Sequence, residues 1–421
     1  MTLRERDKPV PRANANARPT TGAESTGSRR AFLLGAGAAG LAAMLPHPGR
    51  AQTPLPDIRY FRIGTGTTSG TYFPIGGLIA NAISNPPGSR PCEKGGSCGI
   101  PGLIVVAQAT TGSVENIELL RSGAVEAGLA QADVAWWAYS GTGSFKGKPP
   151  FEALRSLGML YAEAIQLVVR ADSGIHSTKD LAGKAISLGE EGSGTLVEAR
   201  LLLDAFGVKE AGLKPAYLKP GTAADRMAKG ELDGFFMVGG YPVSAVSDVA
   251  ARVPIRLIPI EGDIARTLRQ RQRFYMESVI PAEAYPGTAA TPTLALGAEL
   301  LVRADRPEEL IYGIVKALWH ENTRRLLAEG HPRGKSFDPA KAVAGVSVPL
   351  HPGAERYYGE AGLIGNAANE PAGATLPDKP APAASPEPPS VPPPSPVPPT
   401  TTPPATTPPA TIPLPSVKPQ P

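Results

Sequence analysis

Several residue types are scarce in this 421-residue chain. It contains two cysteines and five histidines, and its formal net charge is +4. The lysines and arginines are dispersed and have no aromatic residues interleaved with them, so the chain lacks the electrostatic pattern of a DNA- or RNA-binding surface. We therefore exclude nucleic acid as a partner.

The few histidines also limit the chemistry that the chain can perform. In "WHENTRR", which resembles the zinc motif H-E-x-x-H, Arg324 stands where the second histidine is required. Ser193 in "EEGSGT" lies between glycines, but without the G-x-S-x-G spacing of a serine hydrolase. We therefore expect no catalytic residue, no metal and no cofactor.

The two cysteines, Cys92 and Cys98, lie close together in the glycine- and proline-containing stretch "RPCEKGGSCGIPG". In an oxidising compartment this arrangement favours a disulfide that clips the loop. The alternative is a pair of metal ligands, but the sequence has no second cysteine pair and no histidine at ligand spacing. We expect the disulfide.

Residues 1–51 have the pattern of an export signal. The pair Arg29 and Arg30 precedes a modest stretch of Ala, Gly and Leu, and small residues suited to cleavage follow up to Ala51. The twin arginine resembles a Tat signal, whereas a membrane anchor would need about 20 apolar residues. We expect export to a bacterial periplasm, with cleavage near Ala51.

The other end of the chain, residues 367–421, is rich in proline and poor in large apolar side chains. Such a segment cannot assemble a packed core, so we expect a disordered, extended tail. It is either a solvated spacer or a segment that reaches the wall or binds a partner.

The body between these ends alternates short β-rich runs with helical patterns, which predicts an α/β protein with largely parallel sheets. The expected strands are 60–65, 102–110, 127–132, 166–171, 184–189, 215–219, 234–239 and 256–261, and the expected helices are 73–83, 113–122, 195–206, 223–229, 242–250, 264–271 and 307–327.

The loop "RIGTGTTSGTYFPIG", residues 62–76, is the first of five strand–turn–helix patterns. Gly64 and Gly66 begin the dinucleotide fingerprint G-x-G-x-x-G, but the third glycine comes one position late, at Gly70. The acidic residue expected near the end of the next strand is absent, and no G-K-[ST] follows. A nucleotide site is therefore excluded.

The five turns instead place hydroxyl and amide side chains at helix starts, where backbone N–H groups have no intrahelical partner. Such positions suit a carboxylate or phosphate, although ordinary N-capping explains any one of them alone. In an open α/β sheet, such helix starts lie outside the carboxyl ends of the strands and border one crevice. Asp133 either caps its helix or pairs with a ligand ammonium group, and Gln131 suits either end of a ligand.

The segments "IGTGTTSGTYFPIGG", "ATTGSVENIELLRSG", "GLAQADVAWWAYSG", "SLGEEGSGT" and "LDGFFMVGGYP" resemble, in order, the TAXI family of periplasmic solute receptors. These receptors serve TRAP (tripartite ATP-independent periplasmic) transporters. The resemblance runs from about Phe61 to Leu363. It implies a two-lobed type II periplasmic-binding-protein fold, with lobe 1 from 57–155 and 259–366 and lobe 2 from 156–258. Hinges are expected near 155–160 and 256–261.

The resemblance also implies a monomeric receptor, not an enzyme, that binds a small anionic solute and delivers it to TRAP permease subunits. The solute would be a glutamate-like amino acid or a 2-oxo or dicarboxylic acid. A sensory receptor is one alternative, and an exported enzyme using Ser193 or Asp133 is another. The implied ligand-binding residues are Ser69, Thr71, Tyr72, Ser113, Asn116, Gln131, Asp133, Ser193, Gly194, Thr195, Gly239, Gly240 and Pro242.

The chain departs from the family pattern at three places. Thr68 and Ser69 stand where glycines are usual, Tyr241 replaces a smaller residue, and the Cys92 loop with the proline-rich tail is additional. These differences bear on the size of the pocket and on the choice of ligand.

Overall fold

The computed structural model describes residues 57–272 and 274–364. The expected export signal and proline-rich tail lie outside these residues. Within them, no helix has the length and apolar character needed to cross a membrane. The strands are β1 Arg59–Gly64, β2 Ser84–Asn85, β3 Ile100–Pro101, β4 Leu103–Gln108, β5 Ala127–Gln131, β6 Leu154–Arg170, β7 Ala185–Ser187, β8 Lys214–Ala216, β9 Gly234–Gly239, β10 Ile255–Ile258, β11 Met276–Ile280 and β12 Thr291–Arg303.

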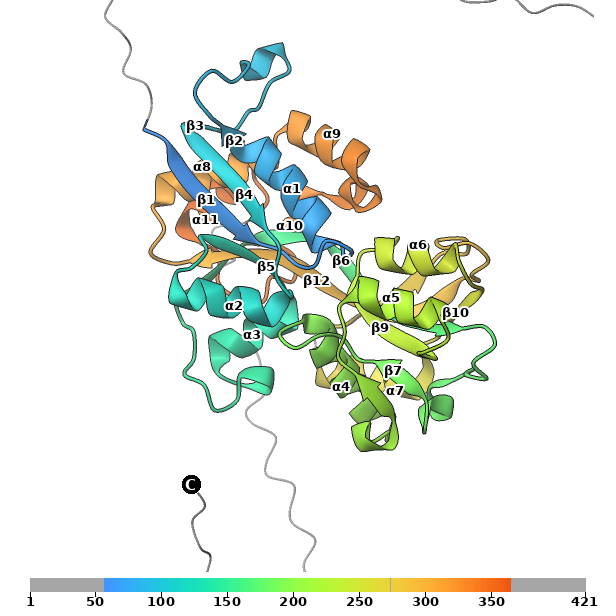
Figure 1. Cartoon of the computed structure of the whole chain (residues 1–421). Helices are drawn as coiled ribbons and strands as arrows, with labels where there is room; N and C mark the ends of the chain where they lie inside the picture. Colours follow the sequence, from blue (N-terminus) through green and yellow to red (C-terminus); the bar gives the residue numbers. More distant parts are fainter. Residues whose placement is uncertain (1–56, 273, 365–421) are drawn as a thin grey trace, which may run out of the picture. The chain divides into compact units, whose positions relative to one another are not determined.

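Helices follow most of the strands, as the alternating sequence pattern predicts (Figure 1). They are α1 Tyr72–Ile83, α2 Ser113–Ser122, α3 Ala132–Ser140, α4 Gly194–Ala205, α5 Pro220–Ala228, α6 Ser244–Ala250, α7 Gly262–Arg271, α8 Glu308–Leu318, α9 Glu321–Gly330, α10 Pro339–Ala342 and α11 Pro352–Glu360, with short 3-10 turns that include η5 Pro332–Ser336.

One sheet connects the described body, in the order β4-β1-β5-β12-β6-β9-β7-β8, with β10 beside β6 and β11 beside β12. Its outer pairs, β4–β1–β5 and β9–β7–β8, are parallel. The long strands β6 and β12 run antiparallel to each other and to their neighbours. The expectation of a largely parallel sheet is therefore wrong: the sheet is mixed, because two long antiparallel strands pass through its centre.

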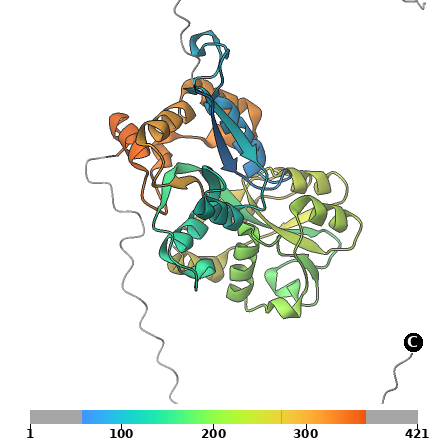
Figure 2. The same ribbon diagram turned by 60° about the vertical axis from the view of Figure 1, so that its left-hand side comes forward.

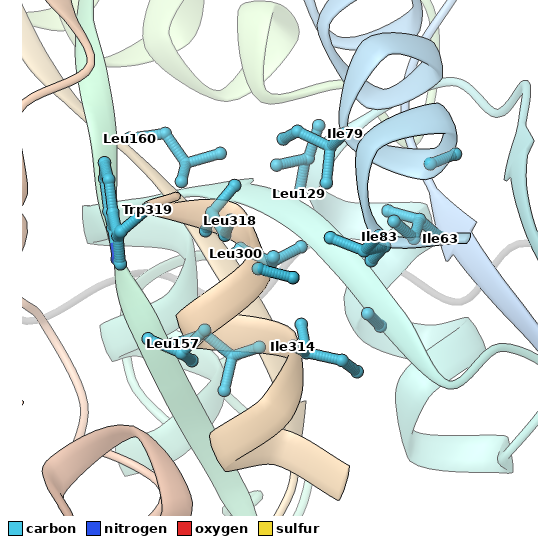
Figure 3. Close-up of a cluster of buried hydrophobic side chains, with 14 of the residues drawn as sticks. Ile63, Ile79, Ile83, Leu129, Leu157, Leu160, Leu300, Ile314, Leu318 and Trp319 are labelled. Atoms are coloured by element: carbon cyan, nitrogen blue, oxygen red, sulfur yellow. The ribbon is translucent and has the colours of Figure 1, made fainter. Parts of the chain in front are cut away.

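The first lobe is built around β4, β1 and β5. Ile63 of β1, Ile79 of α1 and Leu129 of β5 pack with Leu300 of β12 and Leu318 of α8 in one buried cluster (Figure 3). α1 and α9 lie side by side over this part of the sheet (Figure 1, Figure 2). Burial of these aliphatic side chains stabilises the lobe by about 1.5–3 kcal/mol each.

The second lobe surrounds β9, β7 and β8. Phe236 and Leu202 pack with Leu167 of β6 on one face of this sheet, and Phe235 and Val246 belong to a separate cluster on the other face. Phe235 and Phe236 point to opposite faces because side chains alternate along a strand. The lobe is therefore a sheet covered on both faces by helices.

The chain returns to lobe 1 later than residue 259. Ile260, Leu268 and Leu294 belong to the buried cluster of lobe 2, and β10 pairs with the end of β6. Leu300, farther along β12, is already in the core of lobe 1. We therefore place the second crossing within β12 instead of residues 256–261, while β6 carries the first.

The expected helix 307–327 is two helices. α8 ends at Leu318, and His320 begins α9 by accepting the N–H of Asn322 at its Nδ1 (3.2 Å). Trp319 between them is buried and donates its indole N–H to the Tyr358 hydroxyl (2.8 Å). The helix is interrupted at this point, where the Trp319 side chain is held in the core.

Candidate functional site

A cavity lies between the two lobes and has about 560 Å³ of space between protein atoms, its open mouth included. Lobe 1 lines it with residues from the loop 66–72, from 111–113 and with Gln131. Lobe 2 contributes residues from 189–195, 218–223 and 236–238, and Glu163 comes from the central strand β6. Residues from four of the predicted strand–turn–helix patterns, those that lead into α1, α2, α3 and α4, therefore meet at one site.

The loop before α1 contributes two residues with partners from other elements. The Thr71 hydroxyl donates to the Gly240 carbonyl oxygen of lobe 2 (3.0 Å). The Tyr72 hydroxyl donates to Oε2 of Glu163 (2.6 Å), and both of these side chains are buried. This loop thus contacts lobe 2 and also the floor of the cavity.

The start of α2 faces lobe 2 across the cleft. Val114 and Glu115 both donate their backbone N–H groups to the Gly192 carbonyl (3.1 Å each). The Ser113 hydroxyl accepts the backbone N–H of Gln131 (3.2 Å), while the N–H of Ser113 itself has no acceptor among the described residues. Gln131 is 3% exposed, and its Oε1 has no hydrogen-bond partner there.

The start of α4 supplies two more free donors. Ser193 caps this helix: its hydroxyl accepts the N–H of Leu196 (3.1 Å) and donates to the Glu190 carbonyl (2.6 Å). The N–H groups of Gly194 and Thr195 have no acceptor among the described residues. A Cβ atom at Gly194 would lie 1.8 Å from Oε1 of Gln131, so only glycine permits this approach of the lobes.

Sequence reasoning missed the two carboxylates of the cavity, Glu163 and Glu190. Glu163 is 2% exposed and Glu190 is 7% exposed. Burial raises the pKa of Glu163 to about 8 and that of Glu190 to about 7. A single acidic residue within the apolar run "LYAEAIQLVV" was the signal that could have identified Glu163. Glu190 directly follows the predicted strand 184–189.

None of the described residues that line the cavity is a lysine, arginine or histidine. Arg333 lowers the pKa of Glu163, and Lys219 lowers that of Glu190, but in each case burial outweighs the cation. The site therefore offers backbone N–H groups to an anion and carboxylates to a cation.

The structure brings seven of the thirteen predicted ligand-binding residues to the cavity wall: Thr71, Tyr72, Ser113, Gln131, Ser193, Gly194 and Thr195. Ser69 lies in the adjoining groove, where its hydroxyl accepts the Gly221 N–H of lobe 2 (3.1 Å). Gly239, Gly240 and Pro242 do not line the cavity, although Gly240 accepts the hydroxyl of Thr71.

Asn116 and Asp133 also lie outside the cavity lining. The Asn116 amide donates to the carbonyls of Thr65 and Leu129 (2.6 and 2.7 Å) and accepts the Thr110 hydroxyl (2.8 Å). Since all its polar atoms have protein partners, we assign Asn116 a positioning role instead of ligand contact.

Asp133 is fully buried in α3, beside Glu198 of α4. Its Oδ1 accepts the N–H of Val134 (2.8 Å), and burial raises the pKa of both acids. The Tyr275 hydroxyl donates to Glu198. Asp133 therefore joins the two lobes and does not reach the cavity.

Cys92 and Cys98 form the expected disulfide. The structure also places His320 beside it, with Nε2 4.0 Å from Sγ of Cys92, a neighbour that sequence spacing did not reveal. The Nδ1 atom of His320 accepts the Asn322 N–H (3.2 Å), and both cysteine sulfurs are joined in the disulfide. The disulfide therefore closes this loop covalently.

Several solved structures align with the chain. The periplasmic aliphatic sulphonate binding protein SsuA from Escherichia coli is 17% identical over 65% of this chain and 78% of its own, with a TM-score of 0.35. The alkanesulfonate-binding protein SsuA from Xanthomonas axonopodis pv. citri, bound to MOPS, is 16% identical over 75% and 86%, with a TM-score of 0.37. A structure described as a periplasmic transporter is 15% identical over 66% and 92%, with a TM-score of 0.43. With TM-scores below 0.5, these alignments assign no ligand or partner to this chain.

A comparison with sequence families shows the family of this chain. The NMT1-like family matches residues 63–362, which include every strand and helix that borders the cavity. The protein therefore belongs to the NMT1-like family.

Proposed function

We propose that the protein is an exported solute receptor that closes its two lobes around a small carboxylate. The observation that carries this proposal is the set of unpaired backbone N–H groups at the starts of α2 and α4, which face one cavity between the lobes. Helix N-termini bind anions through these donors and through the helix dipole. Oγ1 of Thr111 and Oε1 of Gln131 are buried and have no hydrogen-bond partner among the described residues. They support a ligand at this place, because buried polar atoms are normally hydrogen-bonded.

Closure is supported by hydrogen bonds that span the cleft. Thr71 donates to Gly240, Gly221 donates to Ser69, and the start of α2 donates to Gly192. These bonds and any ligand contacts shared by both lobes exist only in the closed state, so a ligand favours closure by that difference in affinity.

The hinge that we propose lies where β6 and β12 cross between the lobes. Their pairing register shifts between Ala298 and Glu299 and again between Leu300 and Leu301. Gly158 of β6, opposite this region, has a φ of 129°, a backbone conformation that side-chain-bearing residues rarely adopt. Such irregularities bend a strand and are suited to absorb a hinge rotation.

Delivery to the membrane subunits of a TRAP transporter completes the proposal. Its support is the twin-arginine export pattern and the resemblance of the ligand loops to TAXI receptors. A receptor that reports to a sensory partner uses the same binding step. An enzyme acting through Ser193 is disfavoured, because that hydroxyl caps α4 and bonds the Glu190 carbonyl.

The test is a binding screen of the protein purified after removal of its export signal. We expect a dicarboxylate, a 2-oxo acid or an amino acid to raise the unfolding temperature and to bind with a measurable Kd by isothermal titration calorimetry. Small-angle X-ray scattering should show a smaller radius of gyration with the ligand. If no carboxylate in the panel stabilises the protein, the proposal is wrong.

Reconstitution in liposomes distinguishes a transport function from a sensory one. Liposomes that contain a TRAP permease able to pair with this receptor should accumulate the bound solute only when the receptor is added. Binding without uptake would favour a sensory partner.

A further inference from the structure

Two carboxyl groups from opposite lobes meet in the protein interior, outside the cavity. Asp133 belongs to α3 of lobe 1 and Glu198 belongs to α4 of lobe 2, and both side chains are fully buried. We propose that this pair binds one shared proton in the closed state, so that closure of the lobes takes up a proton from solution. The inference rests on the lobe closure of the proposed function, but on no property of the solute.

Both lobes contribute to the surroundings of the pair. Val197 and Leu201 of α4 pack against the buried cluster of lobe 1 that includes Val134 of α3. This apolar contact shields the two carboxyl groups from water. Within residues 57–272 and 274–364, no arginine, lysine or histidine forms an ion pair or a hydrogen bond with either acid. Two negative charges would therefore face each other without a counter-ion from that part of the chain, which desolvation disfavours.

One oxygen of each acid has a hydrogen-bond donor and the other oxygen has none. Oδ1 of Asp133 accepts the N–H of Val134 (2.8 Å), and Oε2 of Glu198 accepts the hydroxyl of Tyr275. Oδ2 of Asp133 and Oε1 of Glu198 are buried and have no donor among the described residues. The two carboxyl groups nevertheless lie within hydrogen-bond reach of each other. Two carboxylates offer only acceptors, whereas a protonated carboxyl also donates, so one proton supplies the missing hydrogen bond.

Glu198 is the acid of the pair that holds the proton. Burial raises the pKa of both acids, and the negative charge of Asp133 raises that of Glu198 further. Glu163 of β6 also raises the pKa of Glu198, while the hydroxyl of Tyr275 lowers it. The pKa of Tyr275 is itself raised by burial, so this hydroxyl stays neutral. At neutral pH the closed state therefore contains a protonated Glu198 beside an ionised Asp133, since like charges at one buried site do not both ionise.

Closure is coupled to this proton because α3 and α4 belong to different lobes. When the lobes separate, water reaches both carboxyl groups, and their pKa values return towards about 3.9 for Asp and about 4.3 for Glu. A group whose pKa is higher in the closed state favours closure at low pH, and this contribution is lost as the pH rises. With one proton taken up, the ratio of closed to open protein should fall by up to about tenfold per pH unit above these values.

The experiment measures closure of the solute-free protein as a function of pH. A spin label is attached to each lobe, through Ser122→Cys in lobe 1 and Lys229→Cys in lobe 2, both of which are exposed positions. Double electron–electron resonance then gives the populations of the short and long label separations from about pH 5 to about pH 8. We expect the population with the short separation to fall as the pH rises.

Variants of the pair and of a neutral contact identify the source of this pH dependence. Glu198→Gln and Asp133→Asn should each remove it, because an amide donates a hydrogen bond without titrating. Tyr275→Phe should move the midpoint to higher pH, since it removes the donor that lowers the pKa of Glu198. Ser69→Ala is the matched control: it removes a bond between the lobes, from the Gly221 N–H (3.1 Å), that involves no ionisable group. This control should lower the closed population and keep its pH dependence.

The outcomes separate the shared proton from the receptor function. A closed population that does not change with pH, or that keeps its pH dependence in Glu198→Gln, overturns the shared proton and leaves the receptor function intact. If Glu198→Gln does not fold, Tyr275→Phe decides, and an unchanged midpoint overturns the proposal. Failure of every carboxylate in the binding screen contradicts the receptor function alone, because this measurement uses no solute.

Discussion

Replacement of Gly194 by alanine should block closure without weakening either lobe. The new Cβ would lie 1.8 Å from Oε1 and 2.5 Å from Cδ of Gln131, and 2.8 Å from Oγ of Ser113. These atoms belong to lobe 1, whereas Gly194 begins α4 of lobe 2. Overpacking of this kind costs about 1–3 kcal/mol. Because the open state escapes this cost, ligand affinity should fall about 5- to 150-fold.

The measurement is calorimetry with the tightest carboxylate of the screen, together with thermal unfolding of the ligand-free protein. Alanine is a better helix former than glycine, so unfolding without ligand should be unchanged or occur at a higher temperature. Gly77→Ala is the control: this glycine lies in α1, and a Cβ there meets nothing within 4 Å. If Gly194→Ala binds ligand as tightly as the control, the lobes do not close through this contact.

Three further predictions concern the closure of the two lobes, the buried carboxyl of Glu299 and the disulfide between Cys92 and Cys98. Thr71→Ala removes the hydrogen bond to Gly240 and should weaken ligand binding by about 0.5–1.5 kcal/mol, while Thr71→Ser keeps the bond and should bind normally in the same calorimetric assay. The pKa of Glu299 is raised by burial to about 7, so the unfolded chain releases its proton first and stability falls as the pH rises from about 4.5 to about 7. Glu299→Gln should lessen this fall by up to about 3 kcal/mol in urea unfolding at pH 4.5 and pH 8, and parallel pH profiles would contradict the assigned pKa. Replacement of Cys92 and Cys98 by serine should cost about 2 kcal/mol of stability for so short a loop but leave ligand affinity unchanged; a loss of affinity would show that the loop acts on the cavity.

The strands that lie beside a turn signal were predictable from sequence. β1, β4, β5, β7 and β9 are short runs of apolar residues bounded by glycine or polar turns; β4, β5, β7 and β9 lie within expected strands, and β1 begins one residue before its expected strand. β12 was not expected, because its sequence "TPTLALGAELLVR" is rich in Leu and Ala and has no clear two-residue alternation. The first half of β6 was missed for the same reason. A strand buried on both faces gives no amphipathic signal.

The residues of the candidate site also fall into two groups, those that the sequence identified and those that it did not. Hydroxyl residues at helix starts, such as Thr71, Ser113 and Ser193, were identified because helix capping and anion binding depend on local sequence. Glu163 was missed, since nothing near it in sequence indicates that β6 passes below the cavity. Asn116 lies in the correctly predicted helix α2, but its side chain donates to the carbonyls of Thr65 and Leu129 instead of reaching the cavity. Local pattern does not specify which face of a loop meets the cleft.

The sequence by itself determined the alternation of strands and helices, the loops that end in helix N-termini and the pair of cysteines that bond. These features depend on residues a few positions apart, where backbone sterics, capping and apolar periodicity act. Tertiary structure alone decided that β6 and β12 run antiparallel between the lobes, and that Gln131 meets Gly194. It also decided that Glu163 is buried in the cavity wall with its pKa raised to about 8, because burial and charge pairing depend on chain segments that are far apart in sequence.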